Sequence, residues 1–248
     1  MSDILDLHNK VALITGAGQG VGRQIALHFA AHGAAGIVVN DYFLDRAEEV
    51  AREINVTGGK AIAAQADVTD LAAVKAMVKR AEEALGPVDI LVNNAGNAGA
   101  VPDPDARKPF WETGPAVWNS FIGVNLYGVI NSASACIPRM IENNRGRIIT
   151  IISDAGRAGE AGLEVYSGAK AGAAGFTRAI ARSLGRYQIT ANCVAIAATL
   201  TPAIEARLKA NPEMEKKMME KYVIRRPGRP NDIANMVLFL ASEASSWI

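Results

Sequence analysis

Short apolar runs alternate with longer amphipathic stretches through most of the chain. Runs rich in Val, Ile, Leu and Ala predict six strands, which begin at Lys10 and then cover 36–41, 60–67, 88 to the turn at 93–96, 147–153 and 189–196. Apolar residues at helical spacing predict helices over 21–32, 44–54, 71–85, 115–143 and 163–185. Such alternation is typical of a parallel sheet with helices on both faces. We therefore expect one right-handed doubly wound α/β domain, a Rossmann-like fold, spanning residues 1–248.

Four glycines follow the first strand, where the apolar run stops and a helical pattern begins: Gly16, Gly18, Gly20 and Gly22. Residues without a Cβ let the backbone turn sharply and approach a bulky polyanion. We expect a pyrophosphate at the N-terminus of the helix that begins near Gly20, where free N–H groups and the helix dipole favour negative charge. The spacing satisfies Gly-x-x-x-Gly-x-Gly, whereas Gly-x-Gly-x-x-Gly fits only loosely. The turn therefore needs support from motifs further along the chain.

A carboxylate ends the second strand. Asp41 lies 19 residues after Gly22, about where a dinucleotide-binding βαβ unit places the acid that hydrogen-bonds the adenosine ribose hydroxyls. Its charge would repel a 2′-phosphate, which predicts NAD (NADH) rather than NADP. The alternative role for Asp41 is to cap the next helix. Arg46 is the nearest cation that would counter this charge, and we expect it to lie too far along its helix.

The alternation breaks at residues 97–114, where prolines, Phe110 and Trp111 predict an irregular excursion over the cofactor face. The helix that follows has Pro115 in its first turn, and Pro138 should kink this helix or shorten its end.

Composition disfavours several function classes. Lys plus Arg (26) nearly balances Asp plus Glu (25), so no long-range field attracts nucleic acid or an anionic membrane. The two cysteines, Cys136 and Cys193, stand far apart without a metal-ligand pattern, and no metal site is expected. The N-terminus lacks the regions of a signal peptide, and no run approaches the ~20 apolar residues of a membrane helix. We expect a cytoplasmic protein that keeps its thiols reduced.

Tyr166 and Lys170 are the residues that carry the chemistry, together with Ser153 at the end of a strand. Residues four apart share a helical face, so the Tyr166 hydroxyl and the Lys170 ammonium can point into one site. A nearby cation, with the positive ring of an oxidised nicotinamide, favours the phenolate and makes Tyr166 a usable acid/base. Ser153 would hydrogen-bond the same substrate oxygen. Ordinary polar surface is the competing interpretation.

These motifs resemble the short-chain dehydrogenase/reductase family over nearly the whole chain. Thr15 to Gly22 matches its TGxxxGxG pattern, a stretch that includes Gln19 and Val21, and the family's NNAG appears as Asn93, Asn94, Ala95 and Gly96. The family's catalytic residues correspond to Asn125, Ser153, Tyr166 and Lys170. The resemblance implies that Lys170 also binds the nicotinamide ribose and that Asn125 holds a water in a proton relay. It further implies that Asp67 and Val68 flank the adenine and that Asn93 and Asn94 support the adenosine side.

The resemblance also implies a homotetramer or homodimer built from the two long helices, and the Ala/Gly-rich run 168–175 suits close helix approach. Ile196-Ala197 departs from the family, which usually has Pro-Gly there, although Thr199 and Thr201 still stand where members commonly contact the cofactor. We expect a substrate lid near 199–224 whose inward residues are Leu208, Met214, Met218 and Met219. The family usually continues past the position of Ile248 into a last strand.

The sequence thus predicts an NAD(H)-dependent oxidoreductase that interconverts a small-molecule secondary alcohol and a ketone. One alternative is an NADPH-dependent 3-oxoacyl thioester reductase, and another is a non-catalytic dinucleotide-binding regulator. Phe110, Trp111 and Trp118 suggest an apolar or cyclic alcohol, although core packing uses such residues as readily.

Overall fold

A computed structural model describes residues 3–201, 204–205, 211, 213, 216, 219–220 and 222–248. Its centre is a six-stranded sheet in the order β3-β2-β1-β4-β5-β6, in which every neighbouring pair is parallel. The strands are β1 (Val11–Ile14), β2 (Gly36–Asp41), β3 (Ala61–Gln65), β4 (Val88–Asn93), β5 (Gly146–Ser153) and β6 (Ile189–Ile196). The strand order reverses between β1 and β4, so a ligand is expected outside the carboxyl ends of these strands.

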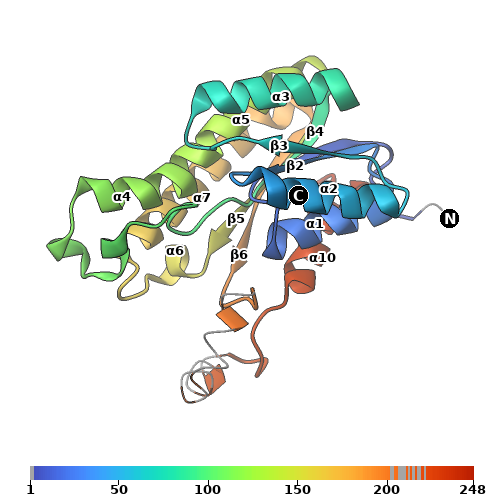
Figure 1. Ribbon diagram of the computed structural model, residues 1–248. Helices are drawn as coiled ribbons and strands as arrows, with labels where there is room; N and C mark the ends of the chain where they lie inside the picture. Colours follow the sequence, from blue (N-terminus) through green and yellow to red (C-terminus); the bar gives the residue numbers. More distant parts are fainter. Residues whose placement is uncertain are drawn as a thin grey trace.

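Helices cover both faces of the sheet (Figure 1). One face carries α1 (Gly20–Ala31), α2 (Leu44–Val56) and α10 (Pro230–Ala241). The other carries α3 (Leu71–Leu85), α5 (Gly128–Glu142) and α7 (Glu164–Leu184). The shorter helical elements are η1 (Pro104–Arg107), η2 (Phe110–Glu112), α4 (Pro115–Ile122), η3 (Gly123–Tyr127), α6 (Ala155–Ala158), η4 (Gly185–Tyr187) and η5 (Glu243–Ser245). The predicted doubly wound, Rossmann-like fold is confirmed.

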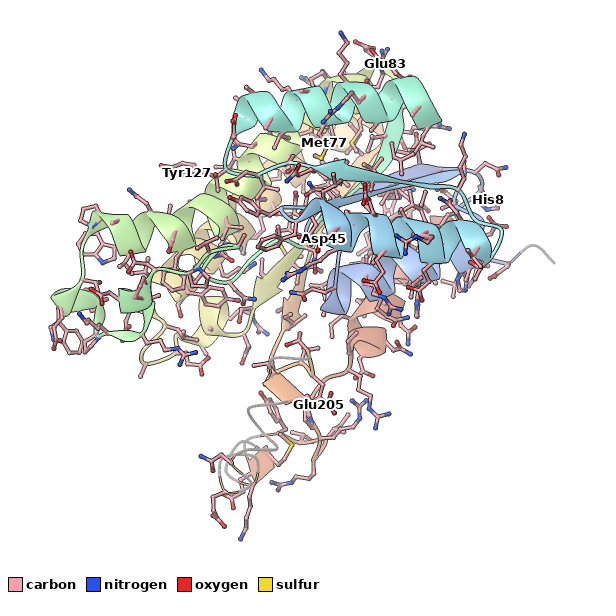
Figure 2. The ribbon with its side chains drawn as sticks, viewed as in Figure 1. His8, Asp45, Met77, Glu83, Tyr127 and Glu205 are labelled. Carbon is pink, nitrogen blue, oxygen red and sulfur yellow. The ribbon has the colours of Figure 1, made fainter. Side chains whose placement is uncertain are left out.

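The amphipathic pattern explains how each helix lies. In α3, Met77 is 1% exposed and packs toward the sheet, whereas Glu83 lies on the outer surface of the same helix (Figure 2). The central strands β1, β2 and β4 are buried along their whole length, because a parallel sheet is covered on both faces. Their continuous apolar runs follow from that burial.

The helix expected over 115–143 consists of three consecutive parts, α4, the π-helical turn η3 and α5. Pro138 does not end α5, which continues to Glu142, because the buried Cys136 and Met140 anchor this stretch on the sheet. The expectation that Pro138 shortens the helix is therefore wrong. Among the described residues, Pro115–Glu142 is also apolar and long enough to cross a bilayer by composition, contrary to the sequence estimate. However, 44% of its apolar window is packed inside the protein, as in a core helix.

Candidate functional site

The turn after β1 depends on glycine at each of its four glycine positions. Gly16 and Gly20 have φ values of +62° and +58°, in the left-handed region that disfavours side chains. A Cβ on Gly18 would lie 2.6 Å from the Arg46 Cβ, and one on Gly22 would lie 2.4 Å from the Gly16 carbonyl oxygen. The turn therefore leaves no room for a side chain at Gly16, Gly18 and Gly22, whereas at Gly20 the backbone conformation alone disfavours one.

This turn delivers the N-terminus of α1 without a side-chain cap. The N-cap residue, Gln19, makes no capping hydrogen bond, and the first turn of the helix contains no acidic residue. The first N–H groups of a helix have no partner within the helix, and they attract anions. The end of α1 thus has the properties of a phosphate site.

Asn94 holds the turn in place from the neighbouring strand end. Its Nδ2 donates to the carbonyls of Thr15 and Gly16, both at 2.9 Å. The Thr15 hydroxyl in turn accepts from the backbone N–H groups of Asn94 and Ala95, at 3.0 and 3.1 Å. The Asn94 side chain is therefore committed to shaping the glycine turn.

Asp41 lies beside the same turn at the carboxyl end of β2. Its carboxylate accepts from the backbone N–H of Gly18 at 3.0 Å and from that of Phe43 at 3.1 Å. The backbone of Arg46 lies close to the glycine turn, because α2 starts at Leu44 and its first turn packs there. The Arg46 guanidinium stacks over the Phe43 ring at 4.3 Å. The expectation that this cation does not counter the Asp41 charge stays a prediction.

The remaining predicted nucleotide contacts lie around this edge. Asp67 is exposed, with one carboxylate oxygen bonded to the N–H and hydroxyl of Thr69, while Val68 is buried. Thr199 is also buried, and the Thr201 methyl lies 3.5 Å from the point where a Cβ on Gly20 would stand. The structure thus brings Thr201 next to the glycine turn.

The predicted lid residues Leu208, Met214 and Met218 lie outside the described residues, and Met219 is half-buried.

Ser153 and Tyr166 meet at the carboxyl end of β5. The Ser153 hydroxyl faces the Tyr166 phenol and acts on its pKa. Burial raises the pKa of Tyr166, the polar interaction with Ser153 opposes this shift, and the charge of Glu160 adds to it. In the protein alone the pKa of Tyr166 is thus raised, whereas the nearby Lys170 was expected to lower it. Sequence reasoning missed Glu160, because a loop carboxylate carries no pattern that ties it to Tyr166.

Lys170 is buried one helical turn beyond Tyr166. Its Nζ donates to the carbonyl of Ile151 at 2.8 Å and lies 5.9 Å from the centroid of the Tyr166 ring. Burial lowers the pKa of Lys170 to about 8, with a smaller opposing effect from Cys193. The predicted juxtaposition of tyrosine and lysine is therefore present. The Ile151 carbonyl was missed, because a backbone group leaves no trace in a sequence.

Asn125 lies in the π-helical turn η3 and is fully buried. Its Nδ2 donates to the carbonyls of Asn97 and Phe121, at 2.6 and 2.8 Å. Its Oδ1 has no hydrogen-bond partner among the described residues. A Cβ on Gly96 would lie 3.1 Å from that oxygen and 3.3 Å from the Lys170 Nζ, so the three residues converge. Such π-turns are frequent at functional sites.

Comparison with known proteins agrees with this arrangement. The family model described as short chain dehydrogenase matches residues 10–212. The chain is 41% identical over 250 residues, or 98% of its length and 94% of the relative's, to the (2S)-[(R)-hydroxy(phenyl)methyl]succinyl-CoA dehydrogenase subunit BbsD of Thauera aromatica. This chain belongs to the short-chain dehydrogenases. It is an oxidoreductase that interconverts secondary alcohols and ketones with a nicotinamide dinucleotide.

Solved short-chain dehydrogenase structures match the fold closely. A 7α-hydroxysteroid dehydrogenase complexed with NADH and 7-oxo glycochenodeoxycholic acid superposes with a TM-score of 0.91 at 39% identity, covering 100% of this chain and 93% of that one. A gluconate 5-dehydrogenase from Burkholderia cenocepacia J2315, in complex with NADP and tartrate, gives 0.90 at 32% identity over 99% and 93%. The two structures hold different dinucleotides, so the fold alone does not choose between them.

The residues of this short-chain dehydrogenase fit a dinucleotide. The uncapped N-terminus of α1 and the glycine turn suit a pyrophosphate, and the orphaned Asn125 Oδ1 offers an acceptor beside Lys170. No group of three or more potential metal ligands occurs among the described residues.

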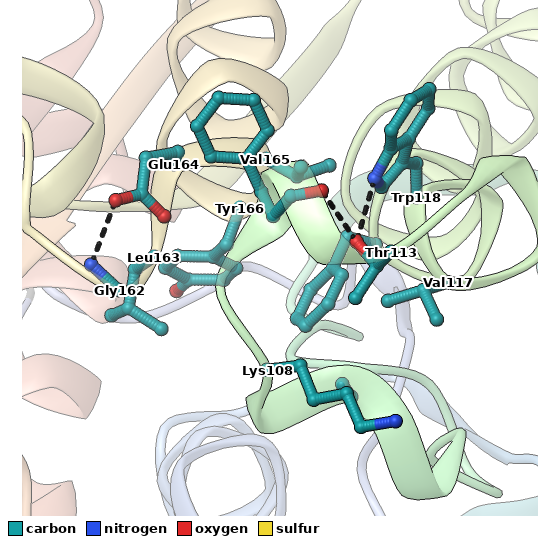
Figure 3. A pocket seen from close by; sticks show the side chains of 12 residues that line it. Lys108, Thr113, Val117, Trp118, Gly162, Leu163, Glu164, Val165 and Tyr166 are labelled. Carbon is teal, nitrogen blue, oxygen red and sulfur yellow. Dashed lines mark hydrogen bonds between the residues drawn. The ribbon is translucent and has the colours of Figure 1, made fainter.

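A small hollow lies against Tyr166 (Figure 3), and its lining is mixed, with Lys108, Thr113 and Glu164 beside apolar and aromatic residues. Residues of the 97–114 excursion and α4 form one wall, and the start of α7 forms the other. Its apolar and aromatic lining is Phe110, Val117, Trp118, Phe121, Leu163, Val165 and the Tyr166 ring. The Trp118 indole N–H is already bonded to the Thr113 hydroxyl at 2.9 Å, so this donor is not free for a ligand. The excursion therefore packs against the helix that carries Tyr166.

Proposed function

We propose that this enzyme oxidises a secondary alcohol with NAD, or reduces the matching ketone with NADH, using Tyr166 as the acid/base. The observation that carries the proposal is the convergence of Ser153, Tyr166 and Lys170 next to the buried Asn125. A bound nicotinamide supplies hydride transfer to and from the substrate carbon. The side chains of the protein accept and donate the proton.

In the oxidation, the substrate hydroxyl gives its proton to Tyr166 as hydride leaves the carbon. Ser153, which faces the same phenol, holds the substrate oxygen and stabilises its alkoxide character. Lys170 presents a cation 5.9 Å from the centroid of the Tyr166 ring, and in this proposal its charge favours the phenolate when the dinucleotide is bound. The Asn125 Oδ1, which has no partner among the described residues, lies near Gly96, as does the Lys170 Nζ. In this proposal, that oxygen binds a water that relays the proton.

The test is the Tyr166→Phe variant, which removes one oxygen atom. We expect turnover to fall by about 10²- to 10⁴-fold, since general acid–base catalysis contributes that much. NADH binding, followed by the fluorescence of the bound cofactor, should remain. Turnover close to that of the wild type would contradict the role of Tyr166.

We propose NAD over NADP because the buried Asp41 carboxylate is held by two N–H groups where the adenosine ribose would lie. Arg46 is the cation to test for NADP binding, since its Cβ lies near the glycine turn and its guanidinium stacks over Phe43. The specificity constants for NAD and NADP should be measured for the wild type, Asp41→Asn and Arg46→Ala. We expect the wild type to prefer NAD and Asp41→Asn to lose that preference. A wild type that prefers NADP, with Arg46→Ala losing it, would overturn the proposal.

We further propose that the substrate carries an apolar or cyclic group, for which the hollow beside Tyr166 and the substrates named for the relatives provide the support. Initial rates with cyclic alcohols, hydroxysteroids and 3-hydroxyacyl-CoA thioesters would test this. A clear preference for straight-chain 3-oxoacyl thioesters with NADPH would instead favour the reductase alternative. Assembly as a homotetramer or homodimer and a cytoplasmic location also belong to the proposal.

A further inference from the structure

The position of Lys170 depends on a backbone carbonyl that the sheet leaves available. Strand β4 ends with Asn93 opposite Thr150, whereas β5 runs on to Ser153 with a partner only on the β6 side. Ile151 is thus the first β5 residue without a neighbour on β4. Its carbonyl accepts from the Lys170 Nζ at 2.8 Å. Whatever fixes α7 along β5 therefore also fixes the catalytic ammonium.

A pair of buried hydroxyls links these two elements next to that contact. Thr150 immediately precedes Ile151, and Thr177 lies on α7 about two turns after Lys170. Both threonines are fully buried, and their hydroxyl oxygens lie 3.0 Å apart. The Thr177 hydroxyl is also 2.9 Å from the Ala173 carbonyl, which can only accept. A hydroxyl has one hydrogen, so Thr177 donates to Ala173 and accepts from Thr150.

The surroundings of this hydroxyl pair are otherwise largely apolar. Val129, Ile152, Ala173 and Ala174 form a buried cluster on which Cys193 packs. Cys193 is the β6 partner of Thr150, and it interacts electrostatically with Lys170. Valine has almost the same shape as threonine and would fill such a core without needing partners. A buried hydroxyl bond is instead directional, and a helix shifted along the strand would leave it unsatisfied.

We propose that Thr150 and Thr177 are positioning residues, whose hydroxyl bond sets the register of α7 on β5 and so holds Lys170 on the Ile151 carbonyl. The proposal rests on the proposed function for its catalytic consequence, but the geometry it asserts can be measured without turnover. The Thr150 and Thr177 hydroxyls are not among the groups proposed to contact the substrate or the dinucleotide. Tyr166 on α7 and Cys193 on β6 are the titratable groups that the structure shows facing Lys170.

The kinetic test uses Thr177→Val, with Thr177→Ser as the conservative variant and Thr190→Val as a matched control on β6. We expect Thr177→Val to lower kcat by about 10- to 100-fold, since small misplacements of catalytic groups have effects of this size. The KM values should change little, and the pH profile of kcat should shift. Thr177→Ser should restore both, and Thr190→Val should resemble the wild type. A purely structural role would lower the melting temperature and leave kcat and its pH profile unchanged.

The second arm follows Lys170 directly by NMR titration of protein labelled with ¹³C at the lysine ε-carbon, with Lys170→Arg used for assignment. A loosened Lys170 becomes better hydrated, so its pKa should rise from about 8 toward the ordinary 10.5 in Thr177→Val. An unchanged titration of Lys170 would overturn the proposal, even if the wild type turned over no alcohol.

If Thr177→Val fails to fold, the Thr150→Val/Thr177→Val double variant takes its place, since it leaves neither threonine hydroxyl of the pair unpaired. The pKa of Lys170 should rise in the double variant as well. A Lys170 pKa equal to that of the wild type would again overturn the proposal.

Discussion

The two ends of the sheet treat buried polar groups in opposite ways. At the carboxyl end, the Asn125 Oδ1 and both side-chain polar atoms of Asn93 have no partner among the described residues. At the amino end, charged groups are paired across elements, although the Arg147 Nε itself has no hydrogen-bond partner among the described residues. Asp89 accepts from the Val11 N–H at 3.1 Å and from Arg145 at 2.7 Å.

The ion pairs at the amino end join the first strand, the fifth strand and the last helical turn. Glu243 in η5 pairs with Lys10 before β1 and, at 3.3 Å, with Arg147 on β5. The side chains of Lys10 and Arg147 are only 11% and 9% exposed, whereas that of Glu243 is 49% exposed. One carboxylate thus compensates two buried cations.

The contrast separates buried polar groups that stabilise the fold from those that can bind a ligand. A buried polar group that is fully paired rigidifies the fold, and one left unpaired lowers stability but remains available to a ligand. Substitutions at the amino end should therefore change stability and spare catalysis. Substitutions at the carboxyl end should do the reverse.

The largest effect is expected for Lys170→Met, which replaces a buried ammonium by an apolar chain of similar length. Turnover should fall by about 10²- to 10⁴-fold. The free energy of unfolding should stay the same or rise by about 1 kcal/mol, because folding no longer buries a charge. Initial rates and thermal unfolding measure the two effects. A clear loss of stability would break the comparison between the two ends.

At the amino end, Glu243→Gln should lower the free energy of unfolding by about 2 kcal/mol. Breaking a buried pair typically costs ~3–5 kcal/mol, and the exposure of Glu243 reduces that value. The specific activity of the folded protein should match the wild type. Denaturant unfolding with parallel rate assays tests both statements, and a variant that is stable but inactive would contradict them.

Asn94→Ala falls between the two classes, because its amide holds the glycine turn through two carbonyls. We expect a loss of about 1 kcal/mol in stability, with NADH affinity reduced by about 10-fold. Fluorescence titration with NADH measures the binding. Unchanged affinity would show that the turn keeps its shape without Asn94.

The smallest expected effect is a change in the free energy of unfolding at acidic pH. The bond to Lys10, with help from the charges of Lys10 and Arg147, lowers the pKa of Glu243 below its ordinary value, while partial burial opposes the shift. A carboxyl with a depressed folded pKa contributes stability above its unfolded pKa of ~4.3, and that contribution is lost as pH falls through the folded pKa. The stability difference between wild type and Glu243→Gln should therefore shrink below about pH 4. Unfolding curves from pH 6 to pH 3 would show this, and a constant difference would exclude the ion pair as its source.

Much of the fold was predictable because the strands are buried on both faces. The limits of β2 and β6 agree with the sequence prediction, since turn residues or charges border each apolar run. The π-turn η3 was not predicted. Its extra residue sits inside a mostly apolar helix pattern, in which Gly123, Asn125 and Gly128 are the residues that differ.

The functional residues that belong to a sequence motif were predictable. Those whose position depends on packing between distant segments were less so. Tyr166 and Lys170 share a face as their spacing requires. The packing of the first turn of α2 on the glycine turn was not predicted, because spacing along a helix does not give distance in space. The Thr150–Thr177 pair was missed because single threonines in apolar runs look the same whether or not their hydroxyls meet.

The early end of β4 has a consequence for mutational scanning. The acceptor that receives the Lys170 ammonium exists because one strand stops before its neighbour, and the Ile151 side chain plays no part in it. Replacing residue 151 with another amino acid keeps the carbonyl, so alanine scanning would pass over this position. Only exchanging the peptide bond itself for an ester, which weakens the carbonyl oxygen as an acceptor, would expose its contribution.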